Sequence, residues 1–169
     1  MIRGRPRFHM KAREHERYRA EAWPEMVASY EALAEDFDLI VIEGAGRTGG
    51  AAEINLRHRD LVNWSIAELT DSPVLLIGDI DKGGVLASLV GTVELRSPAE
   101  RRRIKGLLIN KFRGDLSLLE PGLRFLEERT GIPVLGVLPY RKSPGIPQED
   151  SAMLDGRPGG VRSGTAPDA

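Results

Sequence analysis

The stretch that decides the fold is residues 39–46, which read LIVIEGAG. Four consecutive aliphatic side chains, most of them β-branched, are typical of a strand buried on both faces of a sheet. We expect this strand at 39–42, with Glu43 emerging at its carboxyl end and glycines that let backbone approach a ligand. An acid in this place suits a hard cation such as Mg²⁺ beside nucleotide phosphates. A strand-ending glutamate followed by an ordinary turn is the alternative at this point.

The composition is typical of a globular protein of one-domain size, with 169 residues, 41% hydrophobic and 29% charged. A net charge of −1 gives no bulk attraction to nucleic acid or to an anionic membrane. The sequence contains no cysteine, and its three histidines lack the spacing of a zinc site. We therefore expect no nucleic-acid partner, no membrane partner and, by default, a cytoplasmic location.

Aliphatic segments alternate with helical segments along the chain. The pattern predicts strands at 39–42, 74–77, 107–109 and 134–137, and helices at 60–69, 84–95, 98–103 and 117–129. Two helices are expected before them, at 11–22 and from Pro24 to Glu35, because proline suits a first helical turn. This alternation predicts an α/β fold with a doubly wound, mostly parallel sheet. We expect a domain over 1–142 and, from its Pro/Gly-rich composition, a flexible tail over 143–169.

Polar residues follow three of the expected strands. They are EGAG at 43–46, GDIDKGG at 78–84 and NKFRGD at 110–115. Because active sites of parallel sheets lie beyond the carboxyl ends of the strands, these segments predict a phosphate and metal site. Asp79 and Asp81 would point the same way in an extended segment and could share a cation. Capping of the next helix is the alternative for each of these acids.

The phosphate-binding loop of nucleotide enzymes is missing from this sequence. Such a loop contains a Gly-Lys pair, and no lysine here follows a glycine. Asn110 and Lys111 are similar to the base-reading pair of GTPases, but Arg113 stands where those proteins need an acid. Guanine specificity is therefore not supported.

Five segments, taken together and in order, resemble the cobyric acid synthase family. They are 38–46, 52–57 (AEINLR), 79–84, 109–115 and 131–140 (GIPVLGVLPY), and the resemblance covers roughly residues 1–151. It implies a P-loop NTPase domain of the dethiobiotin-synthetase-like type that uses ATP and Mg²⁺. Such a domain activates peripheral carboxylates of a corrinoid, adenosylcobyrinic acid a,c-diamide. Ammonia from glutamine then converts them to amides, which gives cobyric acid in cobalamin biosynthesis.

The same resemblance implies roles for individual residues. The catalytic residues would be Glu43, Asp79 and Asp81, with Glu43 as the Mg²⁺ ligand. The nucleotide side would be formed by Gly44, Ala45 and Gly46 near the phosphates, and by Asn110 and Lys111 near the adenine. The corrinoid side would include Glu53, Asn55, Gly83 and Gly84.

Three departures from the family limit this interpretation. The family's P-loop strand and its helix would precede residue 1, and its glutamine amidotransferase domain is absent from the sequence. The loop over 47–52 is longer than the family's usual link. We therefore expect a partial synthetase domain that is inactive alone and self-associates through an uncovered strand edge. A non-catalytic regulatory or partner-binding module of the partition-ATPase superfamily is one alternative, and a degenerate gene fragment is another.

Overall fold

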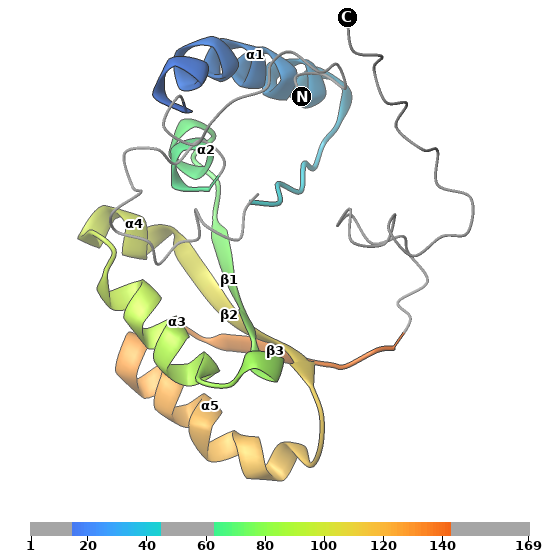
Figure 1. Cartoon of the computed structure of the whole chain (residues 1–169), viewed down its shortest axis with the longest axis vertical. Coiled ribbons are helices and arrows are strands. Elements are labelled where there is room, and N and C mark those ends of the chain that lie inside the picture. The colour runs from blue at the N-terminus through green and yellow to red at the C-terminus, as the bar shows by residue number, and fades with distance from the viewer. Residues whose placement is uncertain (1–14, 45–62, 143–169) are drawn as a thin grey trace, which may run out of the picture.

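The computed structural model describes residues 15–44 and 63–142 (Figure 1). The helices are α1 (His15–Asp36), α2 (Trp64–Leu69), the 3₁₀ helix η3 (Ile80–Lys82), α3 (Val85–Glu94), α4 (Pro98–Arg103) and α5 (Leu116–Thr130). The strands are β1 (Val74–Asp79), β2 (Ile104–Phe112) and β3 (Val134–Pro139). Within these two described ranges, no helix is both long enough and apolar enough to span a bilayer.

The three strands form one parallel sheet in the order β1-β2-β3. This confirms the expected parallel α/β arrangement for the segments at 74–77, 107–109 and 134–137. Both crossovers step in the same direction along the sheet, so right-handed connections place α3 and α5 on the same face (Figure 1). The described residues show no reversal of strand order, and a reversal is what would bring helices onto the second face. The doubly wound part of the prediction is therefore not seen in them.

The core lies between the sheet and the helices α3 and α5. Leu107, Ile109 and Leu126 are completely buried there, and Leu89 and Val93 of α3 pack against them. On the opposite face, side chains of β1 and β3 are half exposed. The described sheet is thus covered by helices on one face only.

The strand predicted at 39–42 is not formed. These residues are extended but belong to no ladder, and the side chains of Leu39 and Val41 are 80% and 87% exposed. A strand needs a neighbour to pair with, and among the described residues no backbone hydrogen bond joins this segment to a strand. The prediction that it is buried on both faces is wrong for the same reason.

The predicted helix start at Pro24 is also wrong, because α1 runs through this residue from His15 to Asp36. Proline removes one backbone donor, but the residues on either side favour helix strongly enough to continue it. The helix at 98–103 has the predicted bounds. Its start is fixed by a capping box in which Ser97 and Glu100 exchange side-chain and backbone hydrogen bonds.

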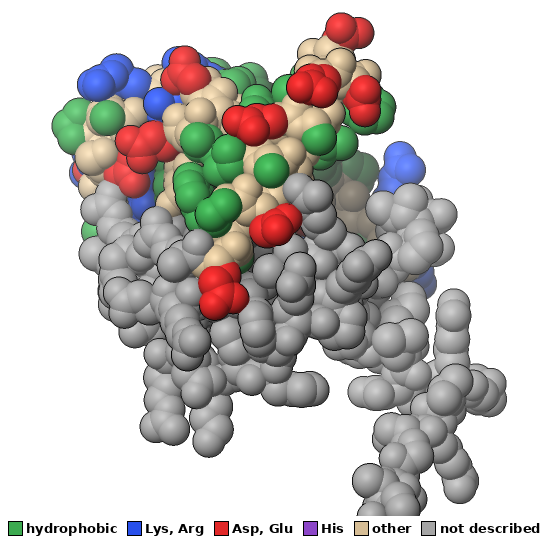
Figure 2. All heavy atoms as spheres, turned by 90° about the horizontal axis from the view of Figure 1, so that it is seen from above, with side chains coloured by type: hydrophobic (Ala, Val, Ile, Leu, Met, Phe, Trp, Pro, Cys, Tyr) green, Lys and Arg blue, Asp and Glu red, His purple; other side chains and the backbone are tan. Residues whose placement is uncertain are grey.

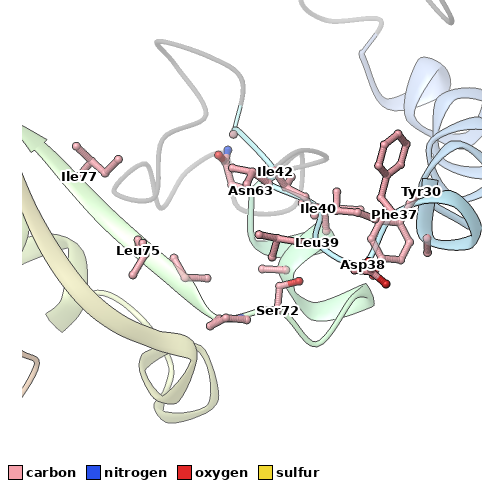
Figure 3. A pocket seen from close by; sticks show the side chains of 17 residues that line it. Tyr30, Phe37, Asp38, Leu39, Ile40, Ile42, Asn63, Ser72, Leu75 and Ile77 are labelled. Carbon is pink, nitrogen blue, oxygen red and sulfur yellow. The ribbon is translucent and has the colours of Figure 1, made fainter. Parts of the chain in front are cut away.

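From above, where α1 is nearest the viewer, acidic and hydrophobic side chains are both exposed on this face (Figure 2). Residues 21–36 of α1 contain five acids and no lysine or arginine. The mixture gives no single apolar surface on the outer side of this helix. On its other side, Tyr30 and Ala34 near the end of α1 line a pocket together with Leu75 and Ile77 of β1 (Figure 3).

Candidate functional site

The carboxyl ends of β1 and β2 bring the predicted polar segments together. Asp79, the last residue of β1, lies opposite Asn110 in the ladder, and Phe112 of β2 lies opposite Pro139 of β3. The backbone N–H of Tyr140 donates a 2.8 Å hydrogen bond to the carbonyl of Phe112. The prediction that segments 78–84 and 110–115 meet at one edge of the sheet is confirmed.

Two ion pairs connect these strand ends. Lys111 Nζ lies 2.8 Å from Asp79 Oδ2, and Arg113 Nε lies 3.2 Å from Asp81 Oδ1. The guanidinium of Arg113 also stacks on Tyr140, with its central carbon 3.4 Å from the ring centroid. Each acid therefore faces its own cation from the end of β2.

The Asp79–Lys111 contact shifts the ionisation of both partners. The hydrogen bond from Lys111 lowers the pKa of Asp79 against the opposing effect of desolvation, and the backbone N–H of Asp81 lowers it further. The same hydrogen bond raises the pKa of Lys111. Asp79 is therefore a carboxylate at neutral pH, suited to accepting hydrogen bonds and not to donating a proton.

The segment after Asp79 is a capped turn instead of the extended chain on which the shared-cation prediction rested. Asp79 Oδ1 accepts a 3.0 Å hydrogen bond from the N–H of Asp81 and caps η3. Gly83 and Gly84 have φ values of +74° and +68°, which glycine adopts without strain. The extended geometry assumed for a shared cation is wrong for this turn, and Asp79 caps η3, not the helix expected at 84–95, whose N-cap is Gly84.

Lys111 has an unusual backbone conformation for a residue with a side chain. Its φ is +63°, and its N–H donates a 2.8 Å hydrogen bond to Asn110 Oδ1. Non-glycine residues in this region are strained and concentrate at functional sites. The turn directs the Lys111 side chain back towards Asp79.

The sequence analysis placed Arg113 in the polar segment 110–115 and Tyr140 at the end of the expected strand 134–137, but gave neither residue a role in the site. A signal for Arg113 was present, because two acids at positions 79 and 81 and two cations at 111 and 113 have the same spacing. The register alone does not make these pairs, because Asp79 lies opposite Asn110 in the ladder and Asp81 lies in η3. Nothing comparable in the sequence marks Tyr140, because its stacking depends on how β3 ends.

Glu43 and Gly44 lie exposed at the end of the extended segment 37–44. The remaining predicted site residues, Ala45, Gly46, Glu53 and Asn55, lie outside the described residues. Over 15–44 and 63–142, no three acidic or histidine side chains gather closely enough to hold a metal ion. In that part of the chain the structure shows no ion pair at Glu43.

Comparisons with known proteins agree with the resemblance in the sequence. A cobyric acid synthase of Desulforamulus reducens is 54% identical over 160 residues, which cover 92% of this chain and 30% of that protein. One of Carboxydothermus hydrogenoformans is 51% identical, covering 92% of this chain and 31% of the relative. One of Sorangium cellulosum is 52% identical, covering 93% and 30%.

This chain thus spans about 30% of the length of the curated relatives it matches. No solved structure matches it. A family model described as an AAA domain matches residues 6–147, which includes all three strands of the sheet and the polar rim at their ends. The chain belongs to this AAA domain family and is homologous to part of the cobyric acid synthases.

Proposed function

We propose that this chain supplies part of the ATP-dependent amidoligase site of a cobyric acid synthase. The observation that carries the proposal is the rim at the strand ends, where Asp79 and Asp81 meet Lys111 and Arg113. Charged groups gathered at the carboxyl edge of a parallel sheet are what phosphoryl transfer requires, because its catalysis depends on positioning and charge neutralisation. The similarity to cobyric acid synthases supports the choice of substrate.

The chemistry that we propose solves a leaving-group problem. Hydroxide leaves a carboxylate poorly, so ammonia does not displace it directly. In the first step a carboxylate oxygen of the corrinoid attacks the γ-phosphorus of ATP, the bond to the β–γ bridging oxygen breaks, and ADP leaves. In the second step ammonia attacks the acyl carbon of the resulting acyl phosphate, phosphate leaves with the C–O electron pair, and nitrogen loses a proton.

The predicted site residues have distinct parts in this proposal. The Glu43 carboxylate would hold Mg²⁺, which neutralises phosphate charge when bound, and Gly44 with Ala45 and Gly46 would border the phosphates. Asn110 and Lys111 would lie near the adenine, with the Lys111 turn fixed by its contacts to Asn110 and Asp79. Gly83 and Gly84 would face the corrinoid side together with Glu53 and Asn55. The phosphate-binding loop itself would come from a preceding strand of the longer protein, as the resemblance implies.

A chimaera tests this function. The matching region of the Desulforamulus reducens protein is replaced by this chain, and ATP-dependent amidation of adenosylcobyrinic acid a,c-diamide is measured with ammonia as donor. We expect turnover in the chimaera and at least a 100-fold lower rate in its Glu43→Gln variant, since loss of one charge-stabilising group costs about this much. Glu128→Gln on the exposed side of α5 is the matched control and should leave the rate unchanged.

A chimaera that folds but shows no ATP-dependent amidation would contradict the proposal, as would a Glu43→Gln variant with full activity. The chain alone should give no turnover with ATP, ammonia and the corrinoid. Measurable turnover by the isolated chain would contradict the expectation that it is inactive alone, but it would still agree with ATP-dependent amidation as the reaction.

A further inference from the structure

The turn that joins β1 to α3 is exposed to solvent. Residues 81–84 are all exposed, and a Cβ built on Gly83 or Gly84 would meet no atom of the described residues within 4 Å. Both glycines have positive φ values, and glycine loses more backbone freedom on folding than any other residue. Within the turn, the N–H of Gly83 donates a 3.1 Å hydrogen bond to the carbonyl of Ile80. The turn therefore depends on contacts from neighbouring elements to keep one conformation.

Two cationic side chains from the end of β2 supply such contacts. Lys111 Nζ lies 2.8 Å from Oδ2 of Asp79, the residue at which the turn begins. Arg113 contacts Asp81 with two atoms, since its Nε lies 3.2 Å from Oδ1 and its Nη2 donates a 3.3 Å hydrogen bond to Oδ2. A two-point contact between a guanidinium and a carboxylate fixes their relative orientation as well as their distance. The end of β2 thus holds the turn at two successive acids.

The two cations are themselves held in place at the ends of β2 and β3. The N–H of Lys111 donates a 2.8 Å hydrogen bond to Asn110 Oδ1, and its φ of +63° is a conformation that persists only where the surroundings determine it. The guanidinium carbon of Arg113 lies 3.4 Å from the ring centroid of Tyr140. The N–H of Tyr140 in turn donates to the carbonyl of Phe112. Each cation therefore reaches the turn from a backbone that is fixed by other contacts.

The backbone and the side chain of Lys111 adjoin different parts of the proposed site. Its backbone N–H contacts Asn110, which the resemblance places near the adenine. Its ammonium group contacts Asp79, which caps η3 and begins the turn that contains Gly83 and Gly84. In the proposed function these two glycines face the corrinoid. Removal of the Lys111 side chain should therefore disturb the corrinoid side of the site and leave the nucleotide side intact.

We propose that Lys111 and Arg113 are positioning residues for the corrinoid, and that their side chains do not bind the nucleotide. By holding the two acids of the turn, they keep its glycines in the one conformation that meets the substrate. A turn that is ordered beforehand binds a ligand without an ordering cost at that moment. The inference rests on the proposed function and deepens it. A Lys111 side chain that contacts the adenine would have the opposite consequence, which an experiment can separate.

The kinetic test compares KM values in the chimaera that carries this chain. Lys111→Met and Arg113→Met each remove a cation but keep an unbranched side chain. We expect the KM for adenosylcobyrinic acid a,c-diamide to rise about two- to fivefold in each variant, as for the loss of a partly exposed ion pair, while the KM for ATP stays unchanged. Lys111→Gly should give the same result, because glycine adopts the backbone conformation of this residue without strain. Lys105→Met, at an exposed lysine near the start of β2, is the matched control and should change neither KM.

Amide hydrogen exchange of the full chain by itself gives a second measurement, which needs no substrate. The N–H groups of Asp81 and Gly83 are hydrogen-bonded within the turn, so their exchange rates report how firmly the turn is held. We expect both amides to exchange about two- to fivefold faster in the Lys111 and Arg113 variants than in the unsubstituted chain. The Lys105→Met control should exchange at the unsubstituted rate.

Three results would overturn the inference. One is a higher KM for ATP with an unchanged KM for the corrinoid in Lys111→Met, which a side chain that binds adenine would give. Another is a pair of KM values that both stay constant or rise together. The third is unchanged exchange of the turn amides in the variants. A chimaera without any amidation would refute the proposed function and, with it, the role towards the corrinoid, whereas the exchange rates would still decide whether Lys111 and Arg113 hold the turn.

Discussion

Replacing Gly78 by alanine tests how closely α3 must approach the sheet. Gly78 is buried near the end of β1, one residue before Asp79. A Cβ built on it would overlap Cγ2 of Val85 and come within 3.1 Å of Cδ1 of Leu89. Val85 is stiff because its β-branched side chain has one strongly preferred rotamer in a helix. The helix therefore has to move away from the strand or accept a poor rotamer.

The size of the effect follows from two opposing contributions. Overpacking of a core by an added methyl group costs about 1–3 kcal/mol. Alanine recovers about 0.5–1 kcal/mol of the entropy that a strand glycine loses on folding. The free energy of unfolding of Gly78→Ala should therefore fall by up to about 2.5 kcal/mol.

Gly136→Ala in β3 is the matched control for the backbone contribution. A Cβ at this residue would meet only Cδ2 of Leu108, at an ordinary contact distance of 3.7 Å. We expect Gly136→Ala to be neutral or up to about 1 kcal/mol more stable than the unsubstituted chain. The difference between the two variants isolates the overpacking penalty, about 1–3 kcal/mol.

Urea unfolding followed by far-UV circular dichroism measures both variants, at a concentration where light scattering gives the same mass for each. Equal unfolding free energies for Gly78→Ala and Gly136→Ala would refute the reasoning, because they would mean that α3 does not pack against Gly78 as the structure shows. A lowered slope of the urea dependence in Gly78→Ala would instead indicate that helix packing is lost altogether.

Three further predictions concern single contacts. In a double-mutant cycle of Asp79→Asn and Lys111→Met, the coupling should be about 0.2–1 kcal/mol, because both side chains are partly exposed. The pKa of Asp79 is lowered in the folded state, so the stability that its ionised form adds is fully present above the unfolded pKa of about 3.9 and is lost as the pH falls through the lower folded value. The pKa of Lys111 is raised, so the stability that its charged form adds is present below the unfolded pKa of about 10.4 and is lost as the pH rises through the higher folded value. Urea titrations should therefore give a constant coupling between about pH 5 and 9, and a coupling that grows on acidification would contradict this. Ser97→Ala should cost about 0.5–2 kcal/mol by removing the capping box of α4, whereas Ser97→Thr keeps the hydroxyl and should cost less; equal losses would argue against the cap. Arg96→Met should remove the cation–π contact to Trp64, whose ring centroid lies 5.1 Å from the guanidinium carbon, and shift the tryptophan emission; an unchanged emission spectrum would count against that contact.

The sequence predicted the three described strands because each of them is a short aliphatic run that ends in turn residues. The core helices α3 and α5 were predicted within a residue or two of their observed ends, as bounded periodic segments usually are. The same reasoning failed at 39–42, although this run has four consecutive aliphatic residues, as many as the strand segment 74–77. Strand formation depends on a pairing partner as well as on composition, and composition alone does not reveal whether that partner is present.

The candidate site was predicted to a similar extent. The rule that parallel strands end at one edge correctly placed Asp79 beside Asn110. It did not reveal that Lys111 would take a left-handed backbone conformation and turn its side chain towards Asp79. Such a conformation has no compositional signature in a lysine, since it is imposed by the surrounding contacts.

The unformed strand at 39–42 and the open edge of β1 have one feature in common, which is that both leave aliphatic side chains exposed. Leu39, Val41, Leu75 and Ile77 are between 51% and 87% exposed, and fully burying a side chain of this kind is worth about 1.5–3 kcal/mol. Burying them against a common neighbour would therefore release several kcal/mol. The free edge of β1 and segment 39–42 are thus a part of the described structure where this burial free energy is left unrealised.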